Sequence, residues 1–221
     1  MFASYFNITV IAEWCTFIAA IFLLNKRTGI WQLFIPFFFL ILVTETLGWY
    51  FHNVVKRYEN ALPFNILLVI SDFFFLWLFS KADVLKKEKR LIVYSLVFFV
   101  VFSVINLFLF EGFWRYNSFS DTLGSILMIT VCCYLLFVLV KKEEYLDLLR
   151  YDYFWLAIGL LFYSLGSIIL YHFTYLLMDF AKETKIDIGT YINYSINLIL
   201  YASLIIAFIC RRKITNLLRA S

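Results

Sequence analysis

Three acidic side chains, Glu13, Glu45 and Asp72, lie inside runs of otherwise apolar residues. A carboxylate at the centre of a membrane helix costs about 2.5–3.5 kcal/mol on insertion scales, so it is kept mainly where it faces a cavity, a partner or a pathway. No apolar run contains a Lys or Arg that could pair with these groups. We therefore expect them to be protonated, or to bind a cationic ligand or ion.

Other polar side chains share helix faces with these acidic residues. Trp49 and His52 follow Glu45 by four and seven residues, a spacing that places all three on one face of a helix. In the third apolar run Asn65 and Asp72 are likewise seven residues apart, and in the seventh Asn193 and Asn197 are four apart. The candidate ligand-binding residues are Glu13, Glu45, Trp49, His52, Asn65, Asp72, Asn193 and Asn197.

Residues for catalysis or metal binding do not occur in recognisable patterns. The HExxH, GxSxG and P-loop motifs are absent, and the chain has only two His. Its four Cys all fall in apolar runs, without a disulfide framework or metal-ligand spacing. The last apolar run has no Lys, which a retinal Schiff base would need. We expect no catalytic residue, metal or cofactor.

Apolar helices must position these side chains, because 64% of the 221 residues are hydrophobic and only 15% are charged. Soluble domains are about 45–50% apolar. A membrane-spanning helix needs about 20 apolar residues. Short connections separate the apolar runs, so we expect one all-α, multi-pass domain over residues 1–221. The seven expected transmembrane helices are 5–24, 30–52, 61–80, 91–110, 118–140, 153–177 and 189–210.

Basic residues orient the chain, because cytoplasmic loops are enriched in Lys and Arg. An N-terminus outside the cell puts fourteen of the nineteen Lys and Arg in the cytoplasm, including a short basic tail at residues 211–221. The five left outside are Lys56, Arg57, Arg115, Lys182 and Lys185. We expect a protein of the inner (plasma) membrane. The basic residues form short clusters between apolar runs, which does not indicate a nucleic-acid partner.

Two segments suggest an internal repeat. Residues 65–81 align with residues 197–213 without gaps, so that an Asn, a Ser and the final Lys coincide. "TLGWYFH" in the second run is similarly matched by "SLGSIILYH" in the sixth. Two parallel triplets of helices joined by a fourth helix would follow, an arrangement known among transporters. This 3+1+3 plan resembles that of sugar and vitamin-precursor carriers of the SWEET and PnuC kind.

Polar residues are unevenly distributed along the expected helices. In the orientation above they lie from mid-depth outward, whereas inner segments such as "FIAAIFLL" and "WQLFIPFFF" have no ionisable group. We expect Glu45 to face a polar cavity open to the outside, with a tightly packed cytoplasmic half. Its expected neighbours are Glu13, Asn65, Asp72 and Asn197.

The segments "ETLGWYFHN" and "ALPFNILLVISDFFFLWLF" resemble small seven-helix bacterial membrane proteins that neighbour sensor kinases. The resemblance covers mainly the second and third helices and supplies no catalytic residues. It implies a membrane-embedded sensor or interaction subunit that binds a small ligand in the outer cavity and signals to a cytoplasmic partner. The alternatives are a small-solute or cation transporter and a carboxylate-dependent membrane lipid hydrolase. The ligand and the oligomeric state are left open by the sequence.

Overall fold

The chain is helical in the computed structural model, which describes residues 7–24, 26–55, 61–113, 115–141 and 148–220. Short 3-10 helices precede α2 (η2, Lys26–Leu33), α4 (η3, Asp83–Leu85) and α6 (η4, Leu148–Arg150). The α-helices are α1 (Ile8–Leu23), α2 (Phe34–Asn53), α3 (Ala61–Phe79), α4 (Lys89–Leu109), α5 (Ser118–Lys141), α6 (Asp152–His172), α7 (Thr174–Thr184) and α8 (Ile188–Ala220).

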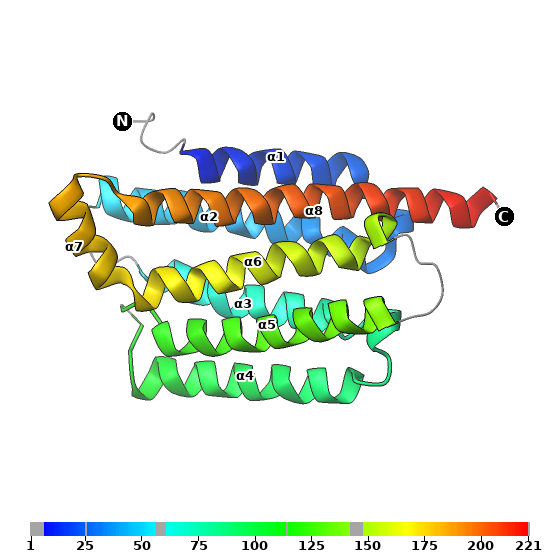
Figure 1. The fold of residues 1–221 in the computed structure, drawn as a ribbon, viewed down its shortest axis with the longest axis horizontal. Helices are drawn as coiled ribbons and strands as arrows, with labels where there is room; N and C mark the ends of the chain where they lie inside the picture. Colours follow the sequence, from blue (N-terminus) through cyan, green and yellow to red (C-terminus); the bar gives the residue numbers. More distant parts are fainter. Residues whose placement is uncertain (1–6, 25, 56–60, 114, 142–147, 221) are drawn as a thin grey trace.

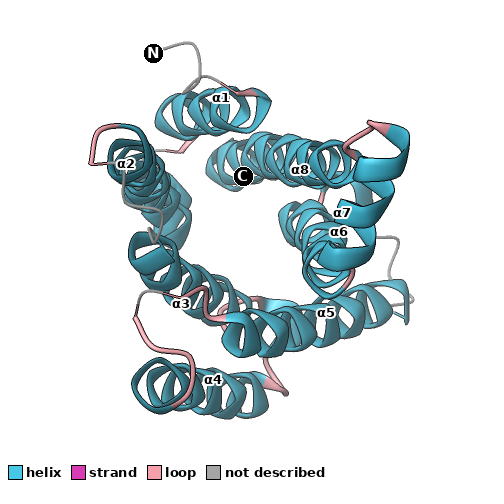
Figure 2. Ribbon diagram, turned by 90° about the vertical axis from the view of Figure 1, so that its left-hand side faces the viewer, coloured by secondary structure: helices cyan, strands magenta, loops and turns pink. Residues whose placement is uncertain are grey.

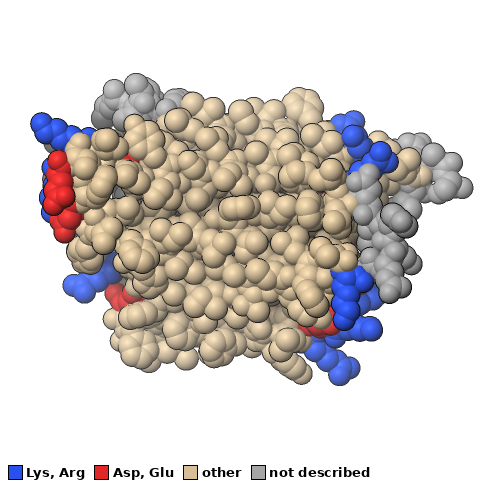
Figure 3. Space-filling model, in the orientation of Figure 1, with Lys and Arg blue, Asp and Glu red and all other residues tan. Residues whose placement is uncertain are grey.

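Six helices in the described ranges are long and apolar enough to cross a membrane, namely α2 to α6 and α8. α1 is also apolar, but its 16 residues extend only about 24 Å. Figure 3 shows an uncharged flank along the length of the bundle, with charged residues at its two ends. An apolar surface of this extent requires lipid around it, so the protein is embedded in a membrane. The number of membrane crossings beyond these six stays a prediction.

The long helices run side by side in a ring of α1, α2, α3, α5, α6 and α8 (Figures 1 and 2). α4 lies outside this ring, against α3 and α5. We call the end of the bundle where α1 begins the Asn7 end; it also holds residues 110–113, 115–117 and 173–187. The opposite end, where α8 finishes, is the C-terminal end and holds residues 80–88 and 148–151.

Small residues let α6 and α8 approach closely. A methyl group at Gly166 would overlap the Ile196 side chain, and one at Gly159 would lie too close to Ser203. Because the hydrophobic effect does not drive association inside a bilayer, membrane helices associate through such close packing and through polar contacts. α6 and α8 therefore form a tightly packed part of the wall around the site.

The predicted sixth span, residues 153–177, is wrong at its end. α6 stops at His172 because Phe173 leaves the helical conformation, and α7 starts at Thr174 in a new direction. The Thr174 hydroxyl donates to the Tyr171 carbonyl oxygen at 2.9 Å. The apolar run continues across this break, so hydropathy alone did not reveal it. At the other end of the chain, residues 211–220 continue α8 as helix.

Charge differs between the two ends of the bundle. In Figure 3 the C-terminal end shows mostly Lys and Arg with a small acidic area, whereas the Asn7 end shows larger acidic areas beside its basic residues. This is the asymmetry expected from the sequence, although Lys56 and Arg57 lie outside the described residues. The orientation of the chain in the membrane and the internal repeat remain predictions.

Candidate functional site

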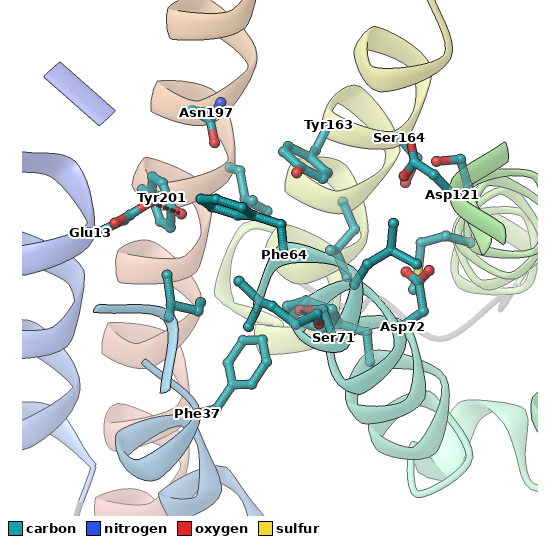
Figure 4. Close-up of a pocket in the computed structure, with 18 of the residues that line it drawn as sticks. Glu13, Phe37, Phe64, Ser71, Asp72, Asp121, Tyr163, Ser164, Asn197 and Tyr201 are labelled. Atoms are coloured by element: carbon teal, nitrogen blue, oxygen red, sulfur yellow. Dashed lines mark hydrogen bonds between the residues drawn. The ribbon is translucent and has the colours of Figure 1, made fainter. Parts of the chain in front are cut away.

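A cavity of about 390 Å³ lies within the ring of helices and extends from the Asn7 half of the bundle to just past its middle. Four acidic side chains line it, one each from α1, α2, α3 and α5. No Lys, Arg or His occurs among the described residues of its lining. The acidic residues are Glu13, Glu45, Asp72 and Asp121 (Figure 4 labels all except Glu45). The cavity is therefore a pocket with acidic groups and no basic counter-charge.

Glu13 is the most enclosed of the four, with 2% of its surface exposed. The Tyr201 hydroxyl donates a hydrogen bond of 3.0 Å to Glu13 Oε1, across the contact between α1 and α8. Oε2 is buried and has no hydrogen-bond partner among the described residues. Because a buried acceptor without a partner costs roughly 1–3 kcal/mol, this oxygen is a ready attachment point for a donor in the cavity.

The four acidic residues form two pairs. Glu13 and Glu45 come from the adjacent helices α1 and α2 and act on each other electrostatically, and Asp72 lies against α5 at Gly124, one turn from Asp121. Within the described ranges, no three His, Cys, Asp or Glu side chains are close enough to hold one metal ion. The carboxyl groups are thus separated into one pair on α1 and α2 and another on α3 and α5.

Gly124 creates the space for Asp72. A methyl group at this position of α5 would overlap Asp72 Oδ2, so the carboxyl group of Asp72 lies directly against the α5 backbone. Asp121 lies one helical turn earlier on α5 and accepts a hydrogen bond of 3.4 Å from the Ser167 hydroxyl. The missing side chain at Gly124 therefore brings the second acidic pair together.

Aromatic side chains form much of the remaining wall. Tyr163 lies between the two acidic pairs in Figure 4, and Phe64 projects toward Tyr201. Tyr116 joins the cavity from the loop before α5, where its hydroxyl interacts with Asp121 and its ring stacks on Tyr171 at 5.6 Å between centroids. Enclosure of this hydroxyl, together with the nearby Asp121 carboxyl group, raises the pKa of Tyr116 above its ordinary value. Tyr116 therefore stays protonated and can donate.

Aromatic packing closes the C-terminal half of the bundle. Trp31, Phe34, Phe38 and Phe208 are all fully buried. The Phe34 ring lies 5.0 Å from the Phe208 ring and 6.0 Å from the Phe38 ring, centroid to centroid. This half of the bundle is packed as the sequence predicted.

On the C-terminal side of this packing, Arg211 of α8 contacts both α6 and η2. Its Nη1 lies 3.2 Å from Asp152 Oδ2, and its guanidinium lies 5.8 Å from the centre of the Trp31 ring. Asp152 is almost fully buried, and its Oδ1 also accepts from the Tyr153 backbone N–H at 2.8 Å. This ion pair was not expected, because the sequence placed Arg211 in a solvated tail.

Comparison with family models, curated proteins and solved structures found no match to this chain. The function must therefore be inferred from the residues and geometry of the chain itself. The resemblance to sensor-type membrane proteins rests only on the two segments quoted above. It stays a prediction.

The structure separates the eight predicted ligand-binding residues into two groups. Glu13, Glu45, Asp72 and Asn197 line the cavity. Trp49 and His52 do not line it, and His52 is exposed near the end of α2. Asn193 lines a shallower groove beside α7, and its side chain accepts a hydrogen bond of 3.0 Å from Asn197. Asn65, described next, also lies outside the cavity lining.

Asn65 is buried at the start of α3 and holds the loop between α4 and α5. Its side-chain nitrogen donates to the Arg115 carbonyl oxygen at 2.7 Å, and its side-chain oxygen accepts from the Asn117 backbone N–H at 2.9 Å. These two hydrogen bonds fix the backbone of the loop on both sides of Tyr116. Asn65 is consequently a positioning residue for Tyr116.

Four lining residues, Asp121, Tyr116, Tyr163 and Tyr201, are absent from the predicted site. Asp121 could have been found, because it is an acidic residue within an expected transmembrane run. The three tyrosines carry no such signal among the 15 in the chain. Their roles become visible only when α6, α8 and the α4–α5 loop are placed around the cavity.

Proposed function

We propose that this protein is a membrane-embedded receptor that binds a small organic cation in the acidic cavity and signals to a cytoplasmic partner. The observation that carries the proposal is the lining itself: four acidic side chains from four helices, without a Lys, Arg or His among the described residues. Acidic groups inside a membrane helix bundle are costly and typically mark a ligand or ion pathway. A cation would offset that cost directly.

The walls suit an organic cation better than a bare ion. Phe64, Tyr163 and Tyr201 present aromatic rings to the cavity, and such rings attract ammonium groups through their faces. The volume of about 390 Å³ falls within the range of roughly 300–1,000 Å³ found for small-molecule sites. The free Oε2 of Glu13 supplies an acceptor for an N–H donor.

A receptor is favoured over a carrier by the C-terminal half of the bundle. A carrier must open a second route past the site, which here would require moving the packed rings of Trp31, Phe34 and Phe208 and breaking the Arg211–Asp152 ion pair. A receptor needs only a change in helix packing that a partner can detect. The basic surface at the C-terminal end offers a place for such a partner or for anionic lipid.

We further propose that α1 crosses the membrane as a seventh span, with the N-terminus outside. α1 packs along α2 and α8 over its length and is apolar throughout except for Glu13 and a few hydroxyl-bearing or small side chains. The excess of Lys and Arg at the C-terminal end then faces the cytoplasm, as positive-inside topology requires. In this orientation the cavity extends from the outer half of the plasma membrane to just past the middle of the bundle.

Thermal unfolding of the protein in detergent or nanodiscs tests the proposed function. Butylamine is the cationic probe, and butanol is its uncharged counterpart of similar size. We expect butylamine to raise the unfolding temperature; at one hundred times its Kd a ligand adds about 2.7 kcal/mol of stability. Butanol should give no comparable shift.

Glu13→Gln is the decisive variant, because glutamine can still accept the hydrogen bond from Tyr201 but carries no charge. We expect it to fold and to lose most of the butylamine shift. Glu183→Gln, an exposed change on α7, is the matched control and should keep the full shift. Equal shifts with butylamine and butanol, or an undiminished shift in Glu13→Gln, would contradict a cation site.

A further inference from the structure

We propose that the ligand is a dication, an α,ω-diamine or polyamine, with one ammonium group at each acidic pair and an alkyl stem between them. This inference rests on the proposed function and narrows it to a substrate class. It follows from how the four carboxyl groups are divided, what lies between them, and which of their oxygens lacks a partner.

The division into pairs is the first step. Glu13 and Glu45 are neighbours on α1 and α2, and Asp72 and Asp121 are neighbours on α3 and α5. In Figure 4 Glu13 lies on one side of the cavity, and the two aspartates lie on the other. Since no three acidic groups converge in the described part of the chain, a single charged centre cannot contact all four. Two centres at separate places can.

Electrostatics gives the second step. Two like charges side by side repel, so each pair gains most from one positive group placed next to it. A monocation beside one pair leaves the other pair without a cation in the lining, which has no Lys, Arg or His among its described residues, so that pair stays protonated; His172, near Asp121, lies outside the lining. A buried charge without a partner is strongly unfavourable. A dication satisfies both pairs with one molecule.

The two pairs are also built alike, which is the third step. Each has a tyrosine hydroxyl at one carboxyl group: Tyr201 donates to Glu13 at 3.0 Å, and Tyr116 interacts with Asp121. A carboxyl group contacted by one hydroxyl keeps further lone pairs for a ligand. Glu13 shows this directly, because its Oε2 is buried and has no partner in the described residues.

Apart from the Tyr163 hydroxyl and a few serines, the rest of the lining is mostly apolar and suits a hydrocarbon stem. Phe64, Leu67 and Leu68 of α3 belong to it, together with Phe37 and Ile41 of α2. The Phe64 ring packs directly against Gly48, because any side chain at that position would overlap it. A chain of methylene groups can cross this surface without leaving a polar group unpaired. A second polar centre in the middle of a ligand would have fewer partners there.

The test compares diamines with monoamines of the same carbon number. Putrescine, cadaverine and hexamethylenediamine are titrated against butylamine, pentylamine and hexylamine by calorimetry on the full-length protein in nanodiscs. We expect the best diamine to bind at least about tenfold more tightly than its monoamine, which corresponds to about 1.4 kcal/mol. The preferred stem length should be sharp, because it must match the separation of the two pairs.

Variants at the two pairs give the second readout. Glu13→Gln and Asp72→Asn should each remove the advantage of the diamine over its monoamine, because each disables one end of the site. Glu45→Gln and Asp121→Asn repeat the test if either first variant fails to fold. The exposed Glu183→Gln control should keep the full advantage.

The possible outcomes separate this inference from the proposed function. If a diamine binds no more tightly than the matched monoamine, the dication inference is overturned while the cation receptor stands. If the diamine advantage persists when either pair is disabled, the two-ended placement is likewise overturned. If no amine binds at all, both proposals fail.

Discussion

Asn65 and Asn197 show how the surroundings decide what a buried polar residue does in this bundle. The sequence aligns them as equivalent positions of a repeat. In the structure Asn65 binds backbone groups of the α4–α5 loop, whereas Asn197 binds Asn193 one turn earlier and lines the cavity. The two residues share a type and an aligned position in the sequence, but only Asn197 lines the cavity.

Replacing Asn65 with Ala tests its positioning role. The change leaves the Asn117 N–H and the Arg115 carbonyl oxygen without their side-chain partner, which we expect to cost roughly 1–3 kcal/mol of unfolding free energy. Hydrogen exchange should rise in residues 115–117 more than elsewhere. Glu183→Ala, on an exposed side chain of α7, is the control and should change stability by less than about 0.5 kcal/mol. Equal losses in both variants would show that Asn65 does not hold the loop.

Individual site residues were predictable where their chemistry conflicts with a membrane. Glu13, Glu45 and Asp72 could be found because an acidic group in an apolar run is costly and needs a reason. Tyr201 and Tyr163 could not, because nothing in the sequence distinguishes them from the other tyrosines among the 15 in the chain. The shared helix face with Glu45 predicts Trp49 and His52 as ligand-binding residues. In the structure that face continues to the end of α2, beyond the cavity.

Among the helices, the segment from α6 to α8 departs most from the sequence-based prediction. Hydropathy predicted the six helices that are long and apolar enough to cross a membrane, because length and apolar content decide which segments can do so. It missed α7 because the apolar run continues through Phe173, where only the backbone changes direction. α8 then starts after Asp187, which accepts from the Thr190 backbone N–H at 3.0 Å and from the Thr190 hydroxyl at 2.6 Å.

The start of α8 should depend on pH through Asp187. Hydrogen bonds from Thr190 hold the pKa of Asp187 below its ordinary value of 3.8. A carboxyl group with a lowered pKa stabilises the folded state above its ordinary pKa, and this contribution is lost as the pH falls through the folded value. We expect the difference in unfolding temperature between wild type and Asp187→Asn to be constant above about pH 5 and to shrink below about pH 4.

A control for this titration is Asp179→Asn, which removes an exposed partner of Lys182 on α7 but leaves the α8 start intact. It should not reproduce the pH dependence of the Asp187 variant. A difference between wild type and Asp187→Asn that stays constant down to about pH 3 would mean that Asp187 does not stabilise the α8 start through its charge.

At the scale of the whole molecule, the bundle has two different halves. The acidic cavity extends from the Asn7 half to just past the middle, and the rest of the bundle toward the C-terminal end is filled with aromatic rings. The sequence predicted this division from the distribution of polar residues along the helices. It could not predict the Arg211–Asp152 ion pair, which depends on α8 continuing as helix past residue 210.

Labelling of single introduced cysteines with a membrane-impermeant maleimide tests the proposed orientation. We expect Lys182→Cys to react in intact cells and Lys213→Cys to react only after permeabilisation, because these positions lie at opposite ends of the bundle. Wild type is the control, since its four native cysteines all lie within helices. The reverse pattern would turn the cavity toward the cytoplasm.

The attachment of α8 has a mechanical consequence. α8 touches α1 at two levels: Tyr201 donates to Glu13 at 3.0 Å, and Arg212 donates to the Phe22 carbonyl oxygen at 3.1 Å. The eleven residues from Tyr201 to Arg211 form continuous helix, and the two ends of this stiff segment are about 15 Å apart. A ligand that changes the distance between Glu13 and Tyr201 would therefore also shift Arg211, because the helix between Tyr201 and Arg211 moves as one rigid segment. Its motion would reach the opposite side of the bilayer without any opening of the aromatic barrier.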